Sequence, residues 1–148
     1  MHPRHLTEEL GRHLGVPLAL DDAGLARLIV DGQLTLDFEL DAGQDRLLAY
    51  AVIGTPPGGG REALFAELLA ANLFGAETGR ASPALDSTRG ELLLWLAFDD
   101  GTDVQDALAA LGDLVTQATY WRSRLAGNGA TSPASSALPP ELAAVLRA

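Results

Sequence analysis

Residues 34–53, LTLDFELDAGQDRLLAYAVI, decide the fold because they hold two strand patterns joined by a short turn. From Leu34 to Asp41 apolar and polar residues alternate strictly, which is typical of a strand with one buried face. From Arg46 to Ile53 both faces are apolar, so both are expected to be covered. The connection at 42–45 has the length of a hairpin, and the two strands are therefore expected to pair antiparallel.

Three helices and three further strands are expected on either side of this hairpin. The first helix carries apolar residues at helical spacing, with Thr7 as its expected N-cap and Gly15 as its stop. The other strands are short apolar runs that end in turns. The expected ranges are about 7–14, 61–74 and 103–126 for the helices and 26–30, 83–86 and 91–98 for the strands.

The resulting order is α-β-β-β-α-β-β-α, and its hairpin-length connections predict an α+β fold with a mainly antiparallel twisted sheet flanked by helices. A length of 148 residues suits one domain, which we assign to residues 1–126. Residues 127–148 are rich in Gly, Ala, Ser and Pro and are expected to form a disordered tail with a short terminal helix. One hypothesis is that Leu142, Val145 and Leu146 of this tail dock onto a groove of the same or a neighbouring subunit.

Composition excludes several classes of function. Acidic residues outnumber basic ones 20 to 10, and the net charge of −10 opposes binding to nucleic acid or to anionic membranes. The basic residues are all arginine, which excludes Schiff bases and lysine general bases. The absence of cysteine excludes thiol nucleophiles, disulfides and thiolate metal sites. No apolar run approaches the length of a bilayer span, and no secretory signal is visible. We expect a cytosolic protein that does not insert into membranes.

Candidate catalytic and metal-binding groups are weak. His2, His5 and His13 have no acidic partner spaced to complete a metal site. Gly58–Gly60 with Ala63 nominally fits a dinucleotide-loop pattern, but it follows an antiparallel hairpin rather than a strand of a parallel sheet. No G-x-S-x-G nucleophile motif is present. We expect no catalytic residue, no metal and no cofactor.

What remains is more apolar surface than a monomer of this size can cover. Residues 46–53 and 92–98 are apolar on both faces, and the helix at 61–74 is apolar almost all round. We infer that part of this surface meets a second subunit, within an acidic shell that limits nonspecific adhesion. The pattern favours a protein-binding homodimer over an enzyme.

Several short motifs follow one another along residues 6–125. They are the Leu14-Gly15 end of the first helix, a strand that ends at Asp31, LTLDFE at 34–39, LLAANL at 68–73, Leu85-Asp86, ELLL at 91–94, and a long helix that ends near Trp121. In this order, and with this size and acidity, the chain resembles the class I type III secretion chaperones, the group around the Tir chaperone.

The resemblance implies a homodimer in the bacterial cytosol that binds the N-terminal region of one or more secreted effectors, holds it partly non-globular and presents it for export without a nucleotide. A secretion ATPase or a regulator is a further partner that it allows. The implied dimer interface is Leu64, Phe65, Leu68, Leu69, Leu73 and Trp95. The implied effector-binding residues are Leu10, Leu14, Leu36, Phe38, Leu48, Tyr50 and Val52, although the sequence leaves open which strand face is which.

Other functions fit the same sequence. A regulatory relative would sequester a partner protein that controls secretion gene expression, without touching DNA. A chaperone-like α+β protein outside any secretion system is a third reading, and an enzyme is a distant fourth. An effector gene beside this one would favour the first function, and a regulator gene would favour the second.

Overall fold

Residues 1–127, which the computed structural model describes, form three α-helices, five strands and one 3-10 turn in the order that the sequence predicts. The expected tail, beyond its first residue Gly127, lies outside the described residues. The elements are α1 (Pro3–Leu14), β1 (Leu25–Val30), β2 (Leu34–Asp41), β3 (Arg46–Gly54), α2 (Arg61–Ala71), η1 (Leu73–Gly75), β4 (Ser82–Asp86), β5 (Glu91–Phe98) and α3 (Val104–Leu125).

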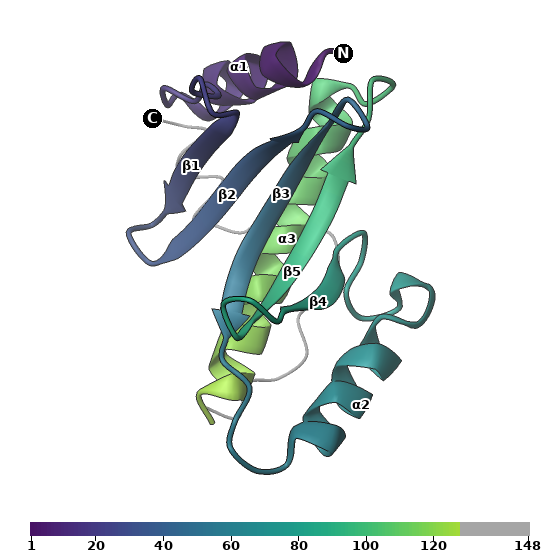
Figure 1. The fold of residues 1–148 in the computed structure, drawn as a ribbon. Coiled ribbons are helices and arrows are strands. Elements are labelled where there is room, and N and C mark those ends of the chain that lie inside the picture. The colour runs from purple at the N-terminus through teal and green to yellow at the C-terminus, as the bar shows by residue number, and fades with distance from the viewer. Residues whose placement is uncertain (128–148) are drawn as a thin grey trace.

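The five strands form one antiparallel sheet in the order β1-β2-β3-β5-β4, as Figure 1 shows. The expected hairpin is present: Asp41 pairs with Arg46, and the Gln44 N–H donates to the Asp41 carbonyl at 3.2 Å. Strand β3 lies at the centre of the sheet because β5 pairs with its other side. Strands β1 and β4 are the two edges, and each leaves one row of backbone groups without a partner strand.

Helices α1 and α3 cover one face of the sheet, which we call the inner face; the opposite side is the outer face. In Figure 1, α3 runs behind the sheet and α1 lies near β1. Phe38, Leu47 and Leu94 of the sheet, with Leu111 and Trp121 of α3, are each at most 1% exposed. Burial of one such side chain contributes about 1.5–3 kcal/mol to folding. Only one of the two apolar faces of β3 is therefore covered within residues 1–127.

The first helix starts earlier than expected, so the assignment of Thr7 as its N-cap was wrong. The helix begins at Pro3, and His2 caps it by accepting a hydrogen bond from the Arg4 N–H at 3.3 Å. Proline suits the first helical position because its fixed φ is helical and its missing N–H would have no partner there. Thr7 lies inside the helix, where its hydroxyl donates to the Pro3 carbonyl at 2.8 Å.

The second helix ends three residues before the expected Phe74. It stops at Ala71, and a 3-10 turn follows in which Phe74 has a left-handed φ of 52°. Phenylalanine rarely adopts this conformation, and here it is followed by Gly75, which also has positive φ. The chain reverses at this point, and the side chain of Phe74 is 98% exposed.

Helix α2 is set apart from the other two helices. Figure 1 shows it beyond the β4 edge of the sheet. Of its residues, only Leu68 and Ala71 are buried. An ion pair between Arg124 and Glu67, 3.1 Å long, links it to the end of α3. A nearly all-apolar helix is thus attached along one side and open on the other.

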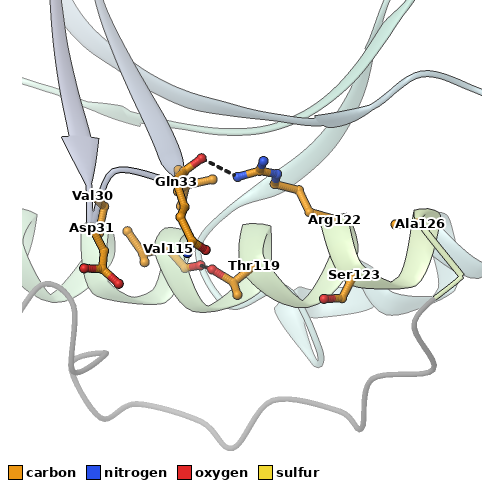
Figure 2. A pocket seen from close by; sticks show the side chains of 9 residues that line it. Val30, Asp31, Gln33, Val115, Thr119, Arg122, Ser123 and Ala126 are labelled. Atoms are coloured by element: carbon orange, nitrogen blue, oxygen red, sulfur yellow. Dashed lines mark hydrogen bonds between the residues drawn. The ribbon is translucent and has the colours of Figure 1, made fainter.

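The last turns of α3 are joined to the turn between β1 and β2. Arg122 donates to the Gln33 carbonyl at 2.9 Å, as Figure 2 shows. A cavity of about 290 Å³ lies beside this bond, with Asp31, Thr119 and Ser123 in its lining. The bond fixes the β1–β2 turn against the helix layer.

Candidate protein-binding surfaces

The outer face carries a half-buried apolar centre. Tyr50 lies opposite Trp95 in the β3–β5 register, and Val52 lies opposite Leu93. Leu48 continues the row on β3, and these five side chains line one hollow of about 440 Å³. Within residues 1–127 no helix covers this face, which is the side of the sheet turned away from α3 in Figure 1. An open apolar hollow of this kind is typical of a binding surface.

Charged side chains surround the apolar centre. Asp37 accepts from Arg27 at 2.7 Å, and Asp41 accepts from Arg46 at 2.9 Å. The Arg46 guanidinium also lies 6.0 Å from the centre of the Trp95 ring. Further charged groups in the lining are Glu39, Asp86, Arg89 and Glu91.

The hydroxyl of Tyr50 reports the negative potential of this face. Burial raises its pKa above the ordinary value, and the nearby Asp37 and Glu39 raise the pKa further. Arg89 and Arg27 act in the opposite direction but do not reverse the shift. Burial and the two carboxylates each disfavour the charged phenolate. At this hydroxyl the two carboxylates outweigh the two arginines.

A second apolar surface lies between α2 and β4, and we call it the helix groove. Phe65, Leu68 and Leu69 of α2 face Pro83 and Leu85 of β4 across a hollow of about 220 Å³. Leu69 is 69% exposed and Leu85 is 49% exposed. Neighbouring large apolar side chains that are this exposed indicate a surface that another polypeptide covers.

The edge strand β1 offers a third contact. Its partner β2 occupies one side. On the other side the backbone groups of Leu25 are bonded to Asp21, and those from Arg27 onward have no partner strand. Leu25 and Ile29 are exposed on it, Ile29 by 57%. Arg27 lies between them and pairs with Asp37. An added strand could use both the backbone groups and these side chains.

The structure divides the effector-binding residues expected from the resemblance into two groups. Leu48, Tyr50 and Val52 lie together on the outer face. The other four do not lie at a surface of the described chain, because strand alternation and the helical stripe turn them toward the inner face. These are Leu10, Leu14, Leu36 and Phe38, each at most 1% exposed.

The expected dimer-interface residues are also divided. Leu64, Phe65, Leu68, Leu69 and Leu73 all belong to α2 or the turn after it, although Leu68 is only 3% exposed. Trp95 is separate from them, because its side chain points to the outer face beside Tyr50. The helix groove is lined on β5 by Leu92, whose side chain points the other way.

Sequence reasoning missed several surface residues. Leu93 belongs to the outer face and follows from the alternation with Trp95, once one face of β5 is known. Glu39 and Glu91 line the same hollow. The sequence does not indicate that Phe74 is exposed, because its exposure results from the early end of α2 and the turn that follows it. Leu85 is exposed because β4 is an edge strand.

Replacing Phe38 tests whether it belongs to the core. Phe38→Ala is expected to lower the free energy of unfolding by about 3–5 kcal/mol, since a large side chain that is 1% exposed would leave a cavity. Urea unfolding measures the change. Tyr50→Ala, on the outer face of the neighbouring strand, is the control and should cost less than half as much. Equal small losses in both variants would show that Phe38 is not packed as described.

Within residues 1–127 no helix is both long and apolar enough to cross a bilayer. In the same part of the chain no three His, Cys, Asp or Glu side chains converge as a metal site would require.

The open apolar surfaces on an acidic α+β subunit define a protein-binding module. The sequence of residues 5–122 matches the Tir chaperone protein (CesT) family, and the chain belongs to that family. Among curated proteins, no significant sequence match is found.

Three solved structures with the same fold are protein–protein complexes, and two of them contain a chaperone. A chain of the HopA1–SchA chaperone–effector complex has 21% identity and a TM-score of 0.67, with 80% of this chain and 91% of that one covered. The type III secretion chaperone SycH of Yersinia pestis, in complex with a fragment of YscM2, has 23% identity and a TM-score of 0.62, covering 78% and 96%. A chain of the ExsC–ExsE complex has 26% identity and a TM-score of 0.66, covering 90% and 95%.

Proposed function

We propose that this chain is a dimeric chaperone of the bacterial cytoplasm that binds the N-terminal segment of one or more type III secretion effectors. It holds the segment partly non-globular and presents it for export. Membership of the Tir chaperone family supports this function. The observation that carries it is the outer face, whose apolar centre of Tyr50, Trp95 and their neighbours is left open by the fold.

The two free surfaces of the sheet suit different parts of an unfolded client. On the outer face the backbone groups of β3 are already paired with β2 and β5, so a client contributes side-chain contacts there. At the β1 edge, a client strand can add hydrogen bonds and cover Ile29. Ordering a disordered segment costs conformational entropy, so wide contact gives only moderate affinity. Moderate affinity suits a chaperone that must release its client.

The helix groove is the proposed dimer interface. The apolar side chains of α2 around Leu69 lie on the opposite side of β4 and β5 from Trp95. Two copies can therefore associate through α2 while both outer faces stay open. Catalysis has no role in this function, because binding and release need no covalent step. A secretion ATPase or a regulator could meet the loaded dimer, and nucleic acid is not a partner.

Affinity capture tests the function. The tagged chaperone is expressed in its source bacterium, captured proteins are identified by mass spectrometry, and each is tested for secretion with and without the chaperone gene. The expected result is a secreted protein whose N-terminal fragment alone binds the chaperone and whose export falls when the chaperone is absent. A captured set with no secreted protein, and normal secretion in the deletion strain, would contradict the proposal.

The similarity to the ExsC–ExsE complex, at 26% identity over 90% of this chain, supports a second candidate. In this alternative the chain sequesters a partner protein that controls expression of secretion genes. Deleting the chaperone would then change transcription from secretion promoters even in a strain that lacks the effectors. An effector chaperone predicts unchanged transcription in that strain.

A further inference from the structure

The proposed client site has charged groups at both ends of its apolar centre. Near Leu48, the end at β2 holds Glu39 and Asp41, with Arg46 paired to Asp41, while the Asp37–Arg27 pair lies beside Tyr50. The opposite end, at the β4–β5 turn, holds Asp86 and Glu91 with Arg89. Counted with their partners, the carboxylates exceed the guanidinium groups by one at each end.

The excess charge is carried by two carboxylates that the fold leaves available. Asp86 is engaged by its own turn, because it accepts the backbone N–H groups of Thr88 at 3.0 Å and Arg89 at 3.1 Å. Within residues 1–127, neither Glu39 nor Glu91 has an ion pair or a hydrogen bond through its side chain. Both side chains line the hollow.

The register separates these two carboxylates along the strands. Glu39 lies level with Leu48, and Leu48 pairs with Ala97 of β5. Glu91 lies at the other end of β5, which at about 3.3 Å per residue places it roughly 20 Å along the strand direction. An occupant of the outer face finds no free backbone partner on β3, so it must satisfy its own hydrogen bonds, as a helix does. A helix spans this distance in about 13 residues.

We propose that the outer face selects client segments that carry basic side chains on either side of an apolar stretch, with Glu39 and Glu91 as the two anchors. The apolar stretch covers Tyr50 and Trp95, and one arginine or lysine reaches each carboxylate. This inference rests on the proposed function and names the chemistry of its client. The carboxylates near Tyr50 also favour a positively charged client. The net negative charge of the chain repels acidic segments that would compete for the site.

Two synthetic peptides test the charge selection. Both are amidated 18-residue amphipathic helices with one apolar face; one carries two arginines 13 positions apart, and the other carries citrulline, which has the same shape without the charge. Fluorescence anisotropy with the full-length chain is expected to give about 3- to 10-fold tighter binding of the arginine peptide at low salt. The ratio should fall below about 2-fold in 0.5 M salt, where the Debye length is short.

The double variant Glu39→Gln, Glu91→Gln should remove the preference and leave the binding of the citrulline peptide unchanged. Glu8→Gln with Glu77→Gln removes the same charge from exposed positions outside the hollow and should retain the preference. Equal binding of the two peptides to the natural chain overturns the charge selection but leaves docking on this face intact. If neither peptide binds a chaperone that still captures its client, the outer face is not the site. Dissociation of the dimer by peptide would assign the face to a second copy and also overturn the proposal.

The peptide measurements can fail while the proposed function still holds, because the two are tested by different assays. Capture and secretion assays decide whether the chain has a secreted client at all. The peptide assay decides only whether Glu39 and Glu91 read basic side chains, since each peptide is compared with an uncharged one of the same shape.

Discussion

Leu69→Asp is expected to convert the proposed dimer into monomers, with the mass falling from about 31 kDa to the 15.5 kDa of one chain. Leu69 is 69% exposed in the helix groove, so the isolated subunit tolerates the change. In a symmetric dimer, however, two unpaired carboxylates would be buried at about 3 kcal/mol each. Together they would weaken association by roughly 10⁴-fold. Light scattering at micromolar concentration measures both masses.

Ala70→Asp is the matched control for this substitution. Ala70 is exposed on the same helix but does not line the helix groove, and its variant should remain dimeric. Dimers in both variants would show that the groove is not the interface. Monomers in both would show that α2 contacts its partner through a different side.

Trp95→Ala is expected to weaken binding of the client's N-terminal fragment by about 30-fold or more. Buried aromatic anchors of protein interfaces typically contribute at least 2 kcal/mol, and Trp95 lies at the centre of the outer face opposite Tyr50. Its half-buried position means that the subunit should stay folded. Calorimetry with the fragment identified by capture measures the affinity, and circular dichroism checks the fold.

Tyr120→Ala is the control for the loss of an aromatic side chain. Tyr120 is half-buried on α3, where its ring packs edge-on against Trp121 at 5.2 Å, on the helix side of the sheet. Its removal should leave client affinity within about 2-fold. If Trp95→Ala and Tyr120→Ala behave alike, the outer face is not the client site.

The sequence predicted the architecture well because the strand signals are local. The alternation from Leu34 to Asp41 and the short turn after it determine one hairpin, and β4 and β5 follow from similar patterns. The end of α2 was missed because its helical pattern continues to Phe74, while Gly75 supports a reversal of the chain. Local patterns thus located the elements better than their ends.

The candidate site was harder to predict because alternation alone does not say which face is buried. Leu36 and Phe38 show the same period as Tyr50 and Val52 on the next strand, yet they lie on opposite faces of the sheet. The placement of α1 and α3 decides between the faces, and that is a long-range property. Tyr50 and Val52 could be assigned to the outer face only once the helices were placed.

The surplus of apolar side chains was the most informative feature of the sequence. The two apolar faces of β3 and the all-round apolar α2 led to the inference that other polypeptides cover part of them. In the described chain one face of β3 lies open, and Leu69, Leu73 and Phe74 near α2 are exposed. Because the chain belongs to a chaperone family, we expect these surfaces to bind other polypeptides.

Light scattering of the chaperone co-purified with the N-terminal fragment of its captured client tests whether a dimer binds a client through its open apolar surfaces. We expect one species heavier than 31 kDa, containing two chaperone chains and at least one fragment, and a bare dimer when Trp95 is replaced by alanine. A 15.5 kDa monomer that leaves the fragment unbound would contradict it.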